Sequence, residues 1–283
     1  MIGALIGDIV GSRFEGANHK SKELELLDGV CGPTDDSIMS LAVAEAILES
    51  NENFSNLSEK AILCMQKLGR AYPFAGYGET FFRWIFSPDP KPYNSFGNGA
   101  GMRVSPCGFA AASIEEAQGL ADKVTVVTHN HPDGLKGAET IAVAVYLARC
   151  GKSKGEIRDY VTAHFYDINF TLDGLRPEYT FDVSCKGSVP VAVEAFYESA
   201  DFEDAIRNAI SVGGDSDTIG AMAVAIAEAY YGVPEKIAEG ALKFLNWQQK
   251  EILFNFEKQY PSRLTDDSGQ IIGVAADVVE KQM

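Results

Sequence analysis

The chain has 283 residues, of which 46% are hydrophobic, and its 40 acidic and 24 basic side chains give a formal net charge of -16. This length and apolar content are typical of a globular protein with a substantial core. The acidic balance argues against a general nucleic-acid surface or an anionic-membrane surface, because both need clustered Lys and Arg to neutralise phosphate. A small ligand or a cationic partner is the better expectation.

The five cysteines are scattered, with no Cys-x-x-Cys pair and no Cys/His pairing at metal-ligand spacing. An odd number of cysteines does not form a closed disulfide framework, so reduced thiols are expected. The N-terminal segment has no basic region, and Asp8 interrupts its apolar run before it could serve as a signal peptide. No apolar stretch approaches the ~20 residues that a bilayer span requires. We therefore expect a cytoplasmic, monomeric protein without a membrane partner.

A buried first helix is predicted over residues 2 to 10, where Ile, Leu and Val recur at helical spacing. Glycines at positions 3, 7 and 11 would let a second helix approach closely. The following loop, residues 11 to 16, places Glu15 beyond the end of this helix. A loop glutamate is ordinarily a solvated acid, and the segment alone gives it no other role.

A second helix is predicted to begin at Thr34, which follows the helix-stopping Pro33 and is a suitable N-cap. Its first turn contains Asp35, Asp36 and Ser37. Further helices are predicted over residues 57 to 70 and 79 to 86, and the aromatic residues of the latter are interpreted as core.

A loop with three prolines leads into a glycine-rich segment, residues 94 to 103, that also contains Ser, Asn and Arg. Glycines allow backbone N–H groups to turn towards an anion, so this segment is a candidate for binding a polar ligand. A helix is then predicted over residues 115 to 127. The break that follows contains His129 and His131, for which hydrogen bonding or helix capping is favoured over zinc because no HExxH spacing and no third ligand is present.

In the rest of the chain, a helix is predicted from Asp133 or Gly134 through Leu147, and further helices over residues 154 to 165, 201 to 211, 217 to 231 and 234 to 257. One further helix is expected after Gly187, with Ser188 as its N-cap and Pro190 in its first turn. Residues 170 to 185 read as strand-like or irregular, and the tail after Pro261 as loosely attached. With no linker, repeat or alternation of strands and helices, the prediction is one all-α domain over residues 1–283, with a core of orthogonal helices at about 1–260.

The segment Gly213 to Thr218 delivers Asp215 and Asp217 to the start of a helix. Two carboxylates at ~4 Å repel each other by about 4 kcal/mol at an effective dielectric constant near 20, which favours a bound cation. An ordinary N-cap with a spare acid is the alternative. However, Thr34 to Ser37 is a second cluster of two aspartates and hydroxyls at a helix start. If the two starts face each other, four carboxylates share one small volume, and a metal would be needed to sustain them.

Clustered Asp and Thr oxygens favour a hard ion, Mg²⁺ or Mn²⁺, and two aspartate pairs suggest two ions. Such a site can orient vicinal hydroxyls or phosphate oxygens and activate a water. The four aspartates and Glu15 would leave about one carboxylate unneutralised for acid–base work. These residues alone do not decide between phosphoryl and glycosidic hydrolysis.

A set of motifs in a fixed order resembles the ADP-ribosylglycohydrolase family. The set comprises Gly7-Asp8-Ile-Val-Gly11-Ser-Arg-Phe-Glu15, Thr34-Asp35-Asp36-Ser37, Ser95-Phe-Gly-Asn98-Gly99-Ala-Gly-Met102-Arg103, Thr128-His129 and Gly213-Gly214-Asp215-Ser-Asp217-Thr218. The resemblance implies a compact all-α fold, a binuclear Mg²⁺ centre and hydrolytic removal of ADP-ribose from modified targets.

By position, the resemblance implies a role for each matching residue. It implies a catalytic role for Glu15, together with the metal-bound Asp36 and Asp217. The implied metal ligands are Thr34, Asp35, Asp36, Asp215, Asp217 and Thr218. The implied substrate-binding residues are Ser95, Phe96, Gly97, Asn98 and Gly99, with backbone N–H groups around the diphosphate and Phe96 near the adenosine, and His129 at the distal ribose.

Two departures from the family pattern are visible. Ser37 replaces the more frequent Thr, and residues 72 to 78 match nothing, which leaves recognition of the leaving group open among arginine, serine, a polymer unit, a nucleobase and a small molecule. A dimetal phosphohydrolase and a non-catalytic, crystallin-like binder of ADP-ribose are the alternative functions. The intact set of acids favours catalysis, because a non-catalytic protein has no reason to tolerate so much clustered negative charge.

Overall fold

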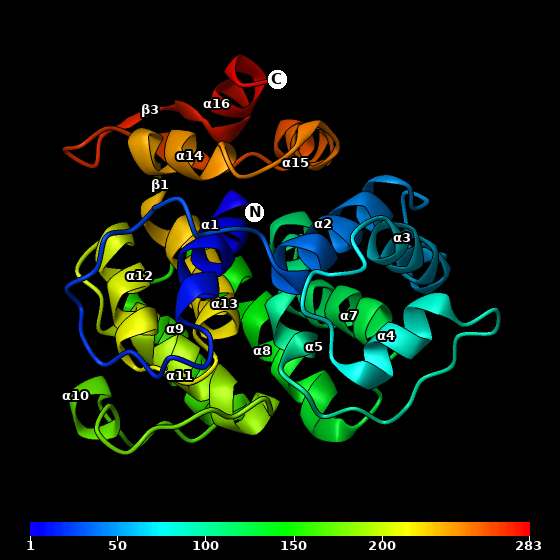
Figure 1. Ribbon diagram of the computed structural model, residues 1–283, viewed down its shortest axis with the longest axis horizontal. Helices are drawn as coiled ribbons and strands as arrows, with labels where there is room; N and C mark the ends of the chain where they lie inside the picture. Colours follow the sequence, from blue (N-terminus) through cyan, green and yellow to red (C-terminus); the bar gives the residue numbers. More distant parts are fainter.

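The computed structural model describes residues 1–283 and is built almost entirely of helices (Figure 1). The prediction of an all-α fold is confirmed, with only three short strands. None of the helices is both long enough and apolar enough to cross a membrane. The helices are α1 (Ile2–Gly11), α2 (Asp35–Leu48), α3 (Leu57–Ala71), α4 (Glu79–Phe86), α5 (Gly99–Met102), α6 (Ser105–Ala110), α7 (Ile114–Thr125), α8 (Pro132–Arg149), α9 (Lys154–His164), α10 (Leu172–Leu175), α11 (Cys185–Tyr197), α12 (Phe202–Ser211), α13 (Ser216–Tyr231), α14 (Glu235–Leu242), α15 (Trp247–Gln259) and α16 (Ala275–Lys281), with a 3-10 turn η1 (Ser12–Phe14) after α1.

The buried helices α1 and α13 lie at the centre, with α2, α3, α4 and α7 on one side and α9 to α12 on the other (Figure 1). Their backbones touch at glycines, as the sequence pattern of α1 predicts. A Cβ atom added to Gly7 would lie 2.2 Å from the carbonyl oxygen of Gly220, and one added to Gly11 would lie 2.4 Å from the Cα of Asp217. This close approach places the end of α1 against the start of α13.

The start of α2 is also built as predicted. Thr34 has extended backbone angles, and its Oγ1 accepts a hydrogen bond from the Asp36 N–H at 3.3 Å, which is the geometry of an N-cap. The helix macrodipole favours acidic side chains in this first turn, where Asp35 and Asp36 lie. Both acid clusters of the sequence therefore occupy helix starts.

Two helical segments differ from the predictions, whereas the predicted capping role of His131 is confirmed at the start of α8. α11 begins at Cys185, because Ser184 Oγ accepts a hydrogen bond from the Gly187 N–H at 3.1 Å and caps the helix, so that Pro190 falls inside it. The segment predicted as one helix over 234 to 257 forms α14 and α15, because Asn246 starts a new helix with a capping box. His131 caps α8 by accepting a hydrogen bond from the Asp133 N–H at 3.1 Å.

The tail after Pro261 is not loosely attached, and that expectation was wrong. β2 (Arg263–Thr265) pairs in parallel with β1 (Val233–Pro234) and antiparallel with β3 (Ile271–Val274). α16 joins α14 and α15 in a layer next to α1 (Figure 1), and its apolar residues Val278 and Val279 are fully buried. The turn at 266–270, rich in Asp, Ser and Gly, dominates the composition of the tail and hides the short apolar stretches on either side of it.

Candidate metal and substrate site

The starts of α2 and α13 meet at the end of α1. Carboxylate oxygens of Asp8, Asp36 and Asp217 lie within 4.8 Å of one another, and so do those of Glu15, Asp215 and Asp217. Asp217 belongs to both groups and joins them. The four aspartates are almost fully buried, whereas Glu15 is exposed at the edge of the cluster.

The hydroxyl-bearing and remaining acidic residues surround this cluster. Thr218 Oγ1 lies 3.3 Å from Asp36 Oδ2 and so connects α13 to α2. Thr34 Oγ1 is also 3.3 Å from Asp36 Oδ2. Asp35 faces the same cavity as Asp36. Its backbone N–H donates to the Ala75 carbonyl at 2.8 Å, which ties the loop of residues 72–78 to the acid cluster.

Asp8 is a functional candidate that the residue-by-residue reading of the sequence gave no role. Its carboxylate accepts hydrogen bonds from the Thr34 N–H (2.9 Å), the Ser37 N–H (3.0 Å) and both of their hydroxyl groups. A carboxylate with so many donors can fix the first turn of α2 in place. The sequence does carry a signal for this role, because Asp8 is the one charged residue of an otherwise apolar helix.

The bond between Asp8 and Thr34 also orients the threonine hydroxyl. Thr34 Oγ1 lies 2.6 Å from Asp8 Oδ1 but 3.3 Å from Asp36 Oδ2. Its single proton therefore goes to Asp8, and its lone pairs are left for the Asp36 N–H or a cation. By orienting the Thr34 hydroxyl, Asp8 directs the lone pairs of that oxygen towards the space between Asp36 and Asp217.

Burial and mutual repulsion raise the pKa values of these carboxyl groups. Burial raises the pKa of Asp36 well above its ordinary value, and the charges of Asp217 and Asp8 raise it further. The pKa of Asp217 is raised by burial and by Asp215. Burial raises the pKa of Asp35 to about 7, with a contribution from Asp8. Burial also raises that of Asp8 to about 6, against the hydrogen bonds that it accepts. These directions mean that several ionised carboxylates in this volume are unfavourable without a positive charge beside them.

The residues present fit a hard divalent cation. Asp36 Oδ1 is buried and has no hydrogen-bond partner, which is the state of a ligand atom directed at an ion. The neighbouring donors are carboxylate and hydroxyl oxygens, without Cys or His in either acid group. Such donors suit Mg²⁺ or Mn²⁺.

A cavity of about 590 Å³ opens over the cluster. This volume is in the range of pockets that enclose small-molecule ligands. Of the residues predicted for the site, Thr34 alone does not line it. The predicted residues that do are Glu15, Asp35, Asp36, Ser95, Phe96, Gly97, Asn98, Gly99, His129, Asp215, Asp217 and Thr218.

The glycine-rich segment reaches the acid cluster through Asn98. The buried Asn98 side chain donates from Nδ2 to Asp215 Oδ2 at 2.6 Å and to Ser188 Oγ at 3.1 Å. Its backbone N–H donates to the Val183 carbonyl at 2.7 Å, and the Gly97 N–H donates to Ser95 Oγ at 3.2 Å. These two backbone donors, expected to face a diphosphate, are engaged inside the protein, so Asn98 contributes its side chain to the site.

His129 is held as a neutral ring with its proton on Nε2. Burial lowers its pKa well below the ordinary value, and the positive charge of Arg103 lowers it further. Arg103 Nη2 lies 3.3 Å from His129 Nδ1, and a guanidinium can only donate, so Nδ1 is the acceptor. The Nε2–H then faces Gly97 and Gly99 at the cavity wall. Arg103 is almost fully buried and also donates to Thr128 Oγ1 at 2.6 Å, and this hydroxyl lies 2.7 Å from His129 Nδ1, so Arg103 and Thr128 together face the unprotonated nitrogen.

Comparisons with known proteins identify the family of the chain. The family model described as ADP-ribosylglycohydrolase matches residues 1–255. The ADP-ribosylhydrolase ARH3 of Xenopus tropicalis is 27% identical over 88% of this chain and 88% of its own length, and that of Homo sapiens is 27% identical over 88% and 87%. A solved structure described as an ADP-ribosylglycohydrolase-related protein complex has the same fold, with a TM-score of 0.64 and 23% identity over 100% of this chain and 97% of that one. Since the family model covers most of the sequence, the chain belongs to the ADP-ribosylglycohydrolase family.

Proposed function

We propose that the protein is a Mg²⁺-dependent hydrolase that cleaves the glycosidic bond between ADP-ribose and a modified target and so reverses ADP-ribosylation. The observation that carries this proposal is the meeting of Asp36 and Asp217 beneath a cavity lined by the glycine-rich segment and His129. The names of two relatives, both ADP-ribosylhydrolases, support the same reaction.

Two Mg²⁺ ions, which Mn²⁺ could replace, are proposed to bind between the starts of α2 and α13. The proposed ligands are Thr34, Asp35, Asp36, Asp215, Asp217 and Thr218. The unpartnered Oδ1 of Asp36 and the absence of soft donors in the cluster support this assignment. When bound, such ions supply Lewis acidity to sugar hydroxyls and to a water molecule.

ADP-ribose is proposed to occupy the cavity, with its contacts supplied by Ser95, Phe96, Gly97, Asn98, Gly99 and His129. The Phe96 ring is 54% exposed and lines the cavity, so it can pack on an adenine base. The His129 Nε2–H is a fixed neutral donor that can bind a ribose oxygen without adding charge. His129 in this state takes no part in proton transfer near neutral pH, because its pKa is well below that range.

Glu15 is the residue proposed to move the proton. Burial and the nearby Asp215 raise its pKa above the ordinary glutamate value, and its carboxylate lies at the open side of the acid cluster. During hydrolysis the oxygen of a water molecule bonds to the anomeric carbon of the ribose, while the bond to the leaving group breaks. The Glu15 carboxylate takes a proton from this water, the leaving atom gains a proton from solvent, and Glu15 returns its proton to solvent, so that the net reaction adds OH to the ribose and H to the leaving group.

The products test this reaction directly. Incubation with arginine-linked, serine-linked and nucleic-acid-linked ADP-ribose, with and without Mg²⁺, should release free ADP-ribose from at least one target only when Mg²⁺ is present. Chromatography separates this product from the phosphate or nucleotide that a dimetal phosphohydrolase would release. Binding of ADP-ribose in calorimetry without cleavage of any target would instead support a non-catalytic binder.

Stabilisation by Mg²⁺ should depend on pH. The raised pKa values of Asp8 and Asp35, about 6 and about 7, mean that the metal-free protein loses stability as the pH rises from the ordinary carboxyl pKa of 3.8 to these values. At pH 8 Mg²⁺ meets ionised carboxylates and should add about 2.7 kcal/mol at a concentration 100-fold above its Kd. At pH 5 it must displace protons, so the gain should be much smaller. Scanning calorimetry at the two pH values measures this, and an equal gain at both would contradict the assigned site.

A further inference from the structure

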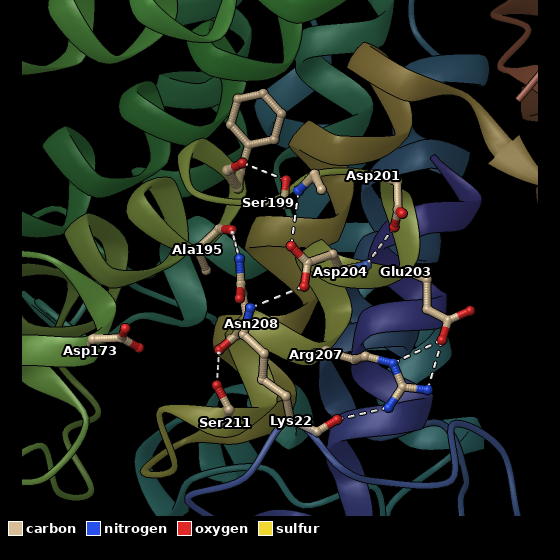
Figure 2. A network of polar contacts seen from close by, with 12 residues as sticks. Lys22, Asp173, Ala195, Ser199, Asp201, Glu203, Asp204, Arg207, Asn208 and Ser211 are labelled. Atoms are coloured by element: carbon tan, nitrogen blue, oxygen red, sulfur yellow. Dashed lines mark hydrogen bonds and ion pairs between the residues drawn. The ribbon is translucent and has the colours of Figure 1, made fainter.

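A polar segment without a predicted role, residues 18–24, follows the Glu15 loop, passes the Gly213–Gly214 turn and ends against α12; we call it the strap. Figure 2 shows its Lys22 next to Asp204 and Arg207 of α12. The strap thus follows Glu15 in the sequence and lies in space against the turn that precedes Asp215 and Asp217.

One end of the strap is fixed to α12. Arg207 Nη1 donates to the backbone carbonyls of Lys22 (2.8 Å) and Leu24 (2.9 Å), and its Nη2 lies 2.7 Å from Glu203 Oε1. Lys22 Nζ pairs with Asp204 Oδ1 at 3.0 Å (Figure 2). The strap is therefore bound to a packed helix through main-chain as well as side-chain contacts.

The other end of the strap holds the turn. Asn18 Oδ1 accepts a hydrogen bond from the Gly214 N–H at 3.2 Å. Lys20 Nζ donates to the Val212 carbonyl at 2.5 Å and to the Tyr179 carbonyl at 2.6 Å. Lys20 thus joins the turn to the segment that leads to Phe181 and Val183 in the cavity wall.

This turn needs an external support. Gly213 and Gly214 have φ values of +75° and +67°, a conformation that glycine enters readily but that glycine also leaves readily. Asp215, directly after them, occupies the N-cap position of α13 without a side-chain cap hydrogen bond. The carboxylates that follow the turn repel each other, which works against the turn and favours contacts that hold it from outside. A Cβ atom on Gly213 would lie 2.4 Å from Asn18 Oδ1, which shows how closely the strap covers it.

We propose that Asn18 and Lys20 are positioning residues that fix the Gly213–Gly214 turn relative to Glu15, so that Asp215, Asp217 and Glu15 act on the same ions as one unit. The inference rests on the proposed function for the metal, but the support of the turn itself does not. The two parts can therefore be tested separately.

The test compares Lys20→Met and Asn18→Ala with Lys22→Met, a change on the same strap that removes only the pair with Asp204. Lys20→Arg restores the positive charge and its donors. In metal-free protein, hydrogen exchange of residues 213–217 should accelerate at least about tenfold in Lys20→Met and Asn18→Ala, with α13 beyond its first turn unchanged. Calorimetric titration with Mn²⁺ should show affinity falling about 10- to 100-fold, as for other residues that orient metal ligands. Lys22→Met should leave both quantities at the wild-type level, and Lys20→Arg should recover part of the affinity.

Wild-type exchange and wild-type Mn²⁺ affinity in both Lys20→Met and Asn18→Ala would overturn the inference. Faster exchange combined with no Mn²⁺ binding by the wild-type protein would overturn the proposed metal function while leaving the support of the turn intact. If Lys20→Met unfolds, the milder Asn18→Ala, which removes one acceptor from the turn, decides by the same two measurements.

Discussion

Asp217→Asn should lower Mg²⁺-dependent release of ADP-ribose by at least about 10³-fold, because Asp217 is the one carboxylate shared by both acid groups. In the absence of Mg²⁺ the same change should leave the protein at least as stable as the wild type near neutral pH. The reason is that the pKa of Asp217 is raised by burial and by Asp215, so its charge opposes folding until a cation is bound. The variant should also lose the stabilisation that Mg²⁺ gives to the wild type.

Glu115→Gln is the matched control for this variant. It is also an acid-to-amide change at a helix start, but Glu115 is exposed and does not line the cavity. It should leave turnover and Mg²⁺ stabilisation unchanged. Steady-state release of ADP-ribose and scanning calorimetry with and without Mg²⁺ measure both effects, and substantial Mg²⁺-dependent turnover in Asp217→Asn would contradict the assigned ligand.

Glu15→Gln should lower kcat by about 10²- to 10⁴-fold, the usual contribution of a positioned acid or base. KM for the ADP-ribosylated substrate should change little, because the cavity lined by the glycine-rich segment and His129 is left intact. The metal affinity should fall far less than in Asp217→Asn, since Glu15 is the exposed member of its group. The limb of the pH profile on the acid side, which reports the raised pKa of Glu15, should disappear.

Glu23→Gln, an exposed acid-to-amide change in the strap that follows the Glu15 loop, is the control for Glu15→Gln and should retain wild-type kcat. Initial rates over a range of substrate concentrations and pH values separate kcat from KM. A wild-type kcat in Glu15→Gln would assign the proton transfer to another group, such as a metal-ligating aspartate.

Most of the helices, and the residues of the acid cluster, could be predicted from local sequence patterns. The glycines of α1 predict the close approach of a second helix, and Thr34 with its two aspartates predicts the start of α2 and the residues that cluster there. These features are visible because each depends on neighbouring residues in the chain: a helical period, a cap, a left-handed turn. By contrast, local patterns do not predict which helix packs on α1, because α13 is distant from it in the sequence.

The parts that the sequence did not predict depend on contacts between distant segments. The role of Asp8 requires the first turn of α2 to lie against α1, and the tautomer of His129 requires the guanidinium of Arg103 beside its Nδ1. The strap has no apolar periodicity that would predict a role. Its proposed role follows only from its contacts with Gly214 and Val212, which are distant in the sequence. The C-terminal tail was wrongly predicted because its polar turn outweighs two short strands in composition.

The most direct test of the central claim is a crystal structure of the protein soaked with Mn²⁺, measured at a wavelength where manganese scatters anomalously. The account predicts two anomalous peaks between the starts of α2 and α13, within ligand distance of Asp36 and Asp217. Anomalous density elsewhere, or none at this position under conditions in which the protein releases ADP-ribose, would contradict it.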